Sequence, residues 1–150
     1  MLPPESAVPT VVLDSNVVLD WLVFRNPECA ALAGALVVGS VRWVATGAMR
    51  NELAHVLSRG HLAAWLPDLA TIWTHWDRHC TEMPEPAPHG PPGRLRCSDS
   101  DDQKFIDLAI ACRARWLVSR DRALLKLARR LRDHGIEVLA PDRWALPTPG

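Results

Sequence analysis

The chain has 150 residues, of which 48% are hydrophobic and 23% are charged, with 17 basic residues balancing 17 acidic ones. This composition is typical of one ordinary globular domain, and it excludes a disordered chain, a collagen-like repeat and a disulfide-stapled miniprotein. No apolar run is long enough for a membrane span, so no membrane is expected as a partner. No basic stretch precedes an apolar segment near the N-terminus, so we expect a cytoplasmic protein without a signal peptide.

Hydrophobic periodicity and turn residues predict strands that alternate with helices. In the first half of the chain, we expect a strand at 10–13, helices at 17–24 and 28–38, a strand at 41–45 and a helix from Thr46 to about Gly60. In the second half, we expect a helix at 61–79 with a break at Pro67, a helix at 103–114, a strand at 116–118, a helix at 123–134 and a strand at 136–139. This alternation predicts an α/β domain with three α/β/α layers and a mainly parallel central sheet.

Two proline-rich segments interrupt or follow these elements. Residues 83–93 hold five of the thirteen prolines, which predicts an irregular loop inside the domain. Residues 141–150 are also rich in proline and are expected to fray. Neither flank of the loop is long enough to fold alone, so we expect residues 1–150 to form one domain with its core at about 10–140.

Acidic residues stand where strands are followed by helices. Asp14 follows the first strand, Asp121 follows the strand at 116–118, and Asp102 begins a helix. Taken singly, an aspartate at such a position is usually a helix cap. In open α/β sheets, however, ligands bind beyond the carboxyl ends of the strands, so we expect these acids to converge there, with Glu52 reaching the same rim from the helix after the second strand. Clustered carboxylates repel one another unless a cation neutralises them, and oxygen-only ligands favour Mg²⁺ or Mn²⁺.

Three segments resemble the successive motifs of the PIN domain family. They read VVLDSNVVLDWL, MRNELAHVLSR and DSDDQKFIDLAIACRARWLVSRDRALLKL, and the resemblance covers about residues 10–140. The positions that match the four acids of the family are Asp14, Glu52, Asp102 and Asp121. Asn16 matches a position that is commonly polar, and Ser119 matches a hydroxyl two residues before the last acid. Asp99 and Asp101 are neighbours that could take the place of Asp102.

The resemblance implies a metal-dependent nuclease that hydrolyses RNA phosphodiester bonds. It implies Asp14, Asp102 and Asp121 as direct or water-mediated ligands of Mg²⁺ or Mn²⁺. Glu52 is then either a further ligand or the acceptor that positions the attacking water. The most similar subgroup is described as toxins of bacterial toxin–antitoxin pairs, so a cognate antitoxin protein is an expected partner.

Arginine dominates the last third of the chain. The stretch from Arg113 to Arg132 holds seven arginines and one lysine, against Asp121 as its single acid. It predicts either a local basic face or an ordinary solvated helix surface. Arg120 and Arg122 flank Asp121, so they are expected either to contact RNA phosphates beside the site or to be plain surface arginines.

A stripe of large apolar side chains runs along residues 62–76. Its members are Leu62, Trp65, Leu66, Leu69, Ile72, Trp73 and Trp76. The stripe is wide for a helix in so small a domain, and it predicts either a homodimer face, as is frequent among PIN proteins, or an intramolecular core.

Two other functions compete with the nuclease. A PIN-like domain without activity could serve as a protein-binding module, although all four acids are present. A haloacid-dehalogenase-like phosphatase also has an aspartate after its first strand, but it needs a second acid two residues later, where this chain has Asn16.

Overall fold

The computed structural model describes residues 8–86 and 102–146. Within them, a sheet of five strands has the order β3-β2-β1-β4-β5, and every neighbouring pair is parallel. In chain order, the strands are β1 (Thr10–Leu13), β2 (Arg42–Thr46), β3 (Cys80–Met83), β4 (Trp116–Val118) and β5 (Glu137–Leu139). The expected parallel α/β architecture is therefore confirmed.

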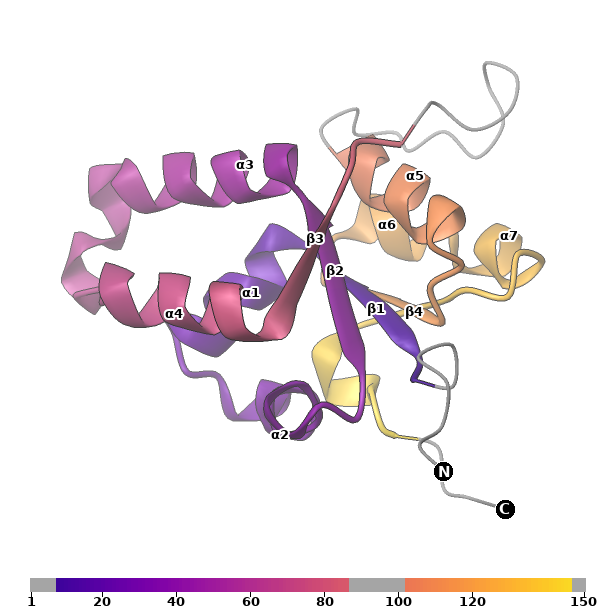
Figure 1. The fold of residues 1–150 in the computed structure, drawn as a ribbon, viewed down its shortest axis with the longest axis horizontal. Helices are drawn as coiled ribbons and strands as arrows, with labels where there is room; N and C mark the ends of the chain where they lie inside the picture. The colour runs from indigo at the N-terminus through magenta and orange to yellow at the C-terminus, as the bar shows by residue number, and fades with distance from the viewer. Residues whose placement is uncertain (1–7, 87–101, 147–150) are drawn as a thin grey trace.

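Helices cover both faces of this sheet. The α-helices are α1 (Ser15–Leu22), α2 (Ala30–Val38), α3 (Gly47–Ser58), α4 (Leu69–His79), α5 (Gln103–Ala111), α6 (Arg122–Leu125) and α7 (Ala128–Arg132). Short 3₁₀ helices are η2 (Pro27–Cys29), η3 (Gly60–Trp65) and η5 (Pro141–Arg143). Figure 1 shows α1, α3 and α4 on one side of the sheet and α5 and α6 on the other, which makes three layers.

The core forms because the central strands consist mostly of buried apolar residues. Val11 and Val12 of β1 and Leu117 of β4 are fully buried, as expected of parallel strands covered on both faces. The helices cover them with apolar stripes, such as Ile106 of α5 and Leu131 of α7, which are also fully buried. In residues 8–86 and 102–146, no single helix is long and apolar enough to cross a membrane, although the bent pair α1 and η2–α2 together meets that test.

Strand β3 is absent from the expectations drawn from the sequence. Its residues Cys80–Met83 pair with β2 at the edge of the sheet, and its two middle residues are exposed, so no buried apolar run announces it. Because Met83 belongs to this strand, the irregular loop expected at 83–93 begins later. Residues 87–93 of that loop lie outside the described residues.

Two expected helices are each divided in the structure. The segment 61–79 forms η3 and then α4, and the break falls at Leu66, whose φ of 47° is left-handed, just before Pro67. The segment 123–134 forms the short helices α6 and α7. Both divisions replace one expected helix by two shorter ones.

The proline-rich tail is ordered up to residue 146, so the fraying expected from 141 is not seen there. Pro141 begins η5, and Trp144 is buried at 3% exposure. The Trp144 ring packs edge-on against Trp116 of β4, with ring centroids 5.3 Å apart. A buried tryptophan outweighs the disordering tendency of its proline neighbours, because it removes a large apolar surface from water.

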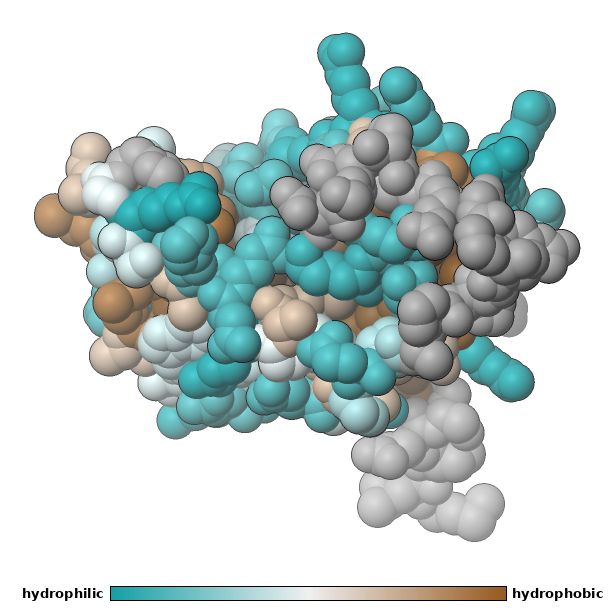
Figure 2. Space-filling model, turned by 90° about the horizontal axis from the view of Figure 1, so that it is seen from above, coloured by the Kyte–Doolittle hydropathy of each residue, from teal (hydrophilic) through white to brown (hydrophobic). Residues whose placement is uncertain are grey.

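The apolar stripe at 62–76 divides between core and surface. Leu62, Ile72 and Trp76 are buried, whereas three members at the η3–α4 junction are exposed, namely Trp65 (55%), Leu66 (86%) and Leu69 (47%). We call these three residues the apolar tip. Figure 1 shows α3 and α4 extending from the sheet to this end of the molecule, and Figure 2 shows hydrophobic side chains gathered there.

Candidate metal centre

Asp14 stands at the carboxyl end of the central strand β1, where it begins α1. Its carboxylate caps the helix, because the backbone N–H of Asn16 donates to Oδ1 at 3.3 Å. The second oxygen, Oδ2, accepts a hydrogen bond of 2.7 Å from the hydroxyl of Ser119. Asp14 is buried at 3% exposure and Ser119 is fully buried, so both oxygens are fixed by the fold.

Ser119 connects two of the acids. It directly follows β4, which pairs with β1 so that Val118 lies beside Leu13. Its Oγ donates to Asp14 and accepts a 2.9 Å hydrogen bond from the backbone N–H of Asp121. Asp121 in turn caps α6 by accepting from the N–H of Ala123 at 2.8 Å. The parallel pairing of β1 with β4 therefore brings Asp14 and Asp121 together, although they are far apart in the sequence.

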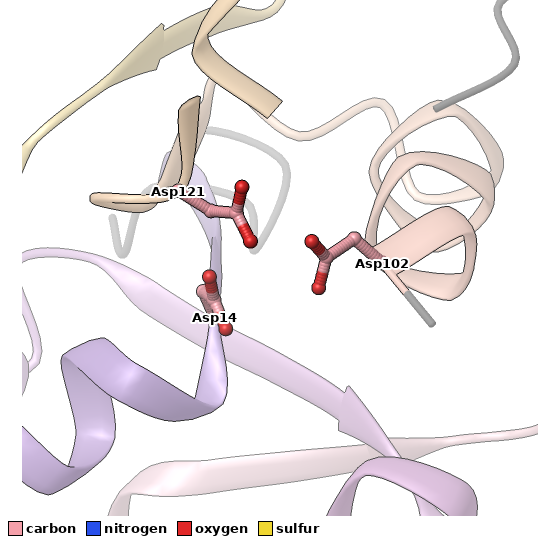
Figure 3. Close-up of side chains that lie close together, drawn as sticks. All are labelled: Asp14, Asp102 and Asp121. Atoms are coloured by element: carbon pink, nitrogen blue, oxygen red, sulfur yellow. The ribbon is translucent and has the colours of Figure 1, made fainter. Parts of the chain in front are cut away.

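Asp102 completes the group from a third element. It precedes α5 and is buried at 8% exposure, but its side chain does not cap that helix. Figure 3 shows its carboxylate pointing toward those of Asp14 and Asp121. Each of the three residues offers a carboxylate oxygen, and these oxygens all lie within 4.8 Å of one another. Within residues 8–86 and 102–146, no other group of three potential ligands of this kind occurs.

The surroundings shift the pKa values of Asp14 and Asp121 in opposite directions. Burial raises the pKa of Asp14, and the charges of Asp121 and Glu52 raise it further, against the hydrogen bonds from Ser119 and Asn16. A hydrogen bond with the Asp102 side chain lowers the pKa of Asp121, with help from the Ala123 N–H. The surroundings thus favour the charged form of Asp121 and disfavour the charged form of Asp14.

A divalent cation fits this group of side chains. The only side-chain donors are carboxylate oxygens, which suit hard cations such as Mg²⁺ and Mn²⁺ better than Zn²⁺. The oxygens of the three carboxylates lie within 4.8 Å of one another, which is close enough for one ion to contact all of them. The arrangement can therefore hold a divalent cation.

Glu52 does not join the three aspartates. It lies on α3, and its Oε2 is 2.7 Å from Nζ of Lys104 on α5. The Glu52 side chain is 33% exposed and the Lys104 side chain is 26% exposed. The charge of Glu52 adds to the raised pKa of Asp14, and the role expected of Glu52 at the site stays a prediction. The sequence analysis predicts no role for Lys104, although this residue lies only two residues after the predicted metal ligand Asp102.

The other expected residues differ in their surroundings. Asn16 reaches Asp14 only through its backbone N–H, and its side chain is exposed. Arg122 is exposed and forms no ion pair in the part of the chain that the structure describes. Asp99 and Asp101 lie outside the described residues.

Arg120 is partly exposed, and its guanidinium is held by two carboxylates. Its Nε is 2.6 Å from Asp20 of α1, and its Nη2 is 2.7 Å from Glu28 of η2. These two ion pairs tie the loop after β4 to the helices around α1. They favour a structural role for Arg120, and the RNA contact expected of it stays a prediction.

Comparison with known proteins agrees with this geometry. Residues 10–123 match the family described as PIN domain, and the chain belongs to that family. PIN domains are generally nucleases, and they typically use divalent metals. The search of curated proteins gave no match.

Proposed function

We propose that this protein is an endoribonuclease that hydrolyses RNA phosphodiester bonds with Mg²⁺ or Mn²⁺ held by Asp14, Asp102 and Asp121. The observation that carries the proposal is the convergence of the three carboxylates, whose oxygens lie within 4.8 Å. A helix cap explains Asp14 and Asp121 taken singly, but it does not explain Asp102, whose buried side chain makes no cap hydrogen bond to α5. A cation would remove the repulsion among these charges, which otherwise destabilises the folded state.

The three aspartates have distinct parts in this proposal. Bound between them, a divalent cation would make a water more acidic and neutralise charge that develops on the phosphate. Ser119 holds Asp14 by a 2.7 Å hydrogen bond, so one ligand is positioned before any cation arrives. The backbone N–H of Ala123 does the same for Asp121. This fixed geometry reduces the reorganisation needed when the site is loaded.

A basic surface beside the acids supports RNA as the substrate. Five cationic side chains follow Asp121 up to the end of α7, and we call the first four of them the basic stripe: Arg122, Lys126, Arg129 and Arg130. All four are exposed, while Leu124, Leu127 and Leu131 of the same segment are buried. None of the four forms an ion pair within the described residues, in contrast to Arg50, Lys104 and Arg120. Exposed cations without ion pairs, which follow Asp121 directly in the sequence, suit the phosphates of a nucleic acid strand.

We also propose that the protein acts as the toxin of a toxin–antitoxin pair and forms a homodimer. The resemblance to toxins of toxin–antitoxin pairs supports a toxin in the cytoplasm whose activity a cognate antitoxin protein blocks. The apolar tip supports a homodimer, because Trp65, Leu66 and Leu69 expose a joined apolar surface that a second copy could cover.

Cleavage of mixed RNA by the purified full chain tests the activity. We expect cleavage with Mn²⁺ or Mg²⁺, none after chelation with EDTA, and a loss of about a hundredfold or more in Asp14→Asn, as for one preorganised electrostatic group. Asp142→Asn is the matched control, since Asp142 is exposed in η5. Folded protein that cleaves no RNA under any of these conditions would favour the inactive protein-binding module instead. Wild-type cleavage rates in Asp14→Asn would exclude Asp14 as a ligand.

A further inference from the structure

Lys104 is the cation nearest to the acidic rim for which the proposed chemistry has no use so far. Its ammonium lies 2.7 Å from Oε2 of Glu52, and the pair bridges α5 and α3. The same ammonium stands 5.0 Å from the ring centroid of Phe105, which is fully buried at 1% exposure. The Lys104 ammonium therefore contacts Glu52 while its side chain stays partly exposed, at 26%.

The ion pair divides the four acids of the rim into two sets. Asp14, Asp102 and Asp121 each place a carboxylate oxygen within 4.8 Å of the other two, and Glu52 does not belong to this group. The Glu52 carboxylate is instead paired with the Lys104 ammonium at 2.7 Å. One divalent cation neutralises most of the charge of three aspartates, and Lys104 neutralises Glu52.

A second divalent cation would need Glu52 as a ligand. Metal-assisted nucleases with two ions place them close together, so acids on both sides are required. On the Glu52 side, the carboxylate oxygen is already in contact with an ammonium, and an ammonium there repels a divalent cation. The described residues hold no other group of three ligands that could replace Glu52.

We propose that Lys104 is a positioning residue that takes the place of a second metal ion: it neutralises Glu52 and limits the site to one divalent cation. The proposal rests on the proposed function, because the single cation is the one held by the three aspartates. Lys104 acts through Glu52, whose carboxylate it holds at the rim beside the bound cation. Its removal should therefore change metal binding as well as RNA cleavage.

Calorimetric titration of the full chain with Mn²⁺ tests this directly. Wild type is expected to bind one ion per chain. Lys104→Met leaves Glu52 uncompensated, so we expect Mn²⁺ affinity to rise roughly threefold to tenfold, or a second weaker ion to bind. RNA cleavage should fall in the same variant, opposite to the change in affinity. Lys104→Arg keeps the charge and should bind Mn²⁺ like wild type.

Two further variants separate the possible outcomes. Glu52→Gln combined with Lys104→Met should return Mn²⁺ affinity close to the wild-type value, because Lys104 acts through Glu52. Arg143→Met is the control, since Arg143 is an exposed cation of η5 that belongs neither to the proposed metal site nor to the basic stripe, and it should leave Mn²⁺ affinity unchanged. Two ions per wild-type chain, or wild-type affinity and stoichiometry in folded Lys104→Met, would overturn the proposal while leaving the nuclease intact. No Mn²⁺ binding by wild type would instead remove the metal site itself.

Discussion

The carboxyl edge of the sheet and the α3–α4 arm (residues 47–79) bury opposite kinds of side chain. At the edge, Asp14 and Asp102 are buried beside Asp121, where like charges raise the free energy of the folded state. In the arm, the Trp76 ring packs edge-on against the Trp43 ring of β2, with ring centroids 5.0 Å apart, and both rings are almost fully buried. The difference indicates that the arm stabilises the fold, whereas the acidic edge is arranged for binding at a cost in stability.

Removing a buried ring from the arm should have the largest effect on the free energy of unfolding. Trp76→Ala removes a ring that is 4% exposed and contacts both Trp43 and Trp73, so we expect a loss of about 3–5 kcal/mol in the free energy of unfolding. Urea unfolding followed by far-UV circular dichroism measures it. Trp65→Ala is the control, because that ring is 55% exposed and should cost much less. Equal losses in the two variants would show that the buried rings do not carry the stability of the arm.

Neutralising the basic stripe should weaken RNA binding without affecting the fold. For Lys126→Gln, Arg129→Gln and Arg130→Gln combined, we expect roughly tenfold weaker binding of single-stranded RNA. The slope of log affinity against log salt should fall by about 2, or about 0.7 for each lost phosphate contact. Arg143→Gln, an exposed arginine of η5, should change neither quantity. An unchanged salt slope in the triple variant would exclude this surface from RNA binding.

Removing one charge from the acidic edge should leave the metal-free protein as stable or more stable. Asn caps a helix nearly as well as Asp, and the Ser119 hydroxyl can still donate to the amide oxygen of Asp14→Asn. Because burial raises the pKa of Asp14, its charged form costs stability at neutral pH, and the wild type regains that stability as pH falls through the raised pKa. We therefore expect a Tm that is a few degrees higher for Asp14→Asn at pH 7.5, and a smaller difference at pH 5. A clearly lower Tm of the variant at pH 7.5 would show that the charge stabilises the fold.

Association through the apolar tip should depend on a small number of side chains. Leu66→Asp places a charge on a residue that is 86% exposed, so it cannot disturb a core, but it should convert a micromolar homodimer into a monomer. Sedimentation equilibrium measures the mass. Leu146→Asp changes an exposed leucine outside the tip and should leave the dimer intact. A monomeric wild type at these concentrations would remove the dimer from the account.

The acidic edge was predictable because parallel strands direct their carboxyl ends to one side. Asp14 and Asp121 each follow a buried apolar strand, and that pattern is local. Ion pairs across long sequence distances are not local, so nothing near Arg120 predicts its attachment to Asp20 and Glu28, which are 100 and 92 residues away. The ion pair of Glu52 with Lys104 could not be predicted for the same reason.

Parts of the fold went unpredicted where local composition and tertiary packing disagree. Strand β3 forms because its backbone pairs with β2, while its exposed Thr81 and Glu82 carry no strand-like alternation of buried residues. Trp144 lies among prolines that suggest fraying, yet its contact with Trp116 orders the segment. In both places the decisive contact joins residues far apart in the sequence.

The central claim is that Asp14, Asp102 and Asp121 together hold a divalent cation. Titration of the metal-free full chain with Mn²⁺, followed by calorimetry and by Tm, tests it most directly. The account predicts a saturable binding event and a Tm that rises with Mn²⁺ concentration, because the cation binds the folded state preferentially. It also predicts a much smaller rise in Asp14→Asn and an unchanged rise in Asp142→Asn. No detectable heat of binding and no change in Tm at millimolar Mn²⁺ would contradict it.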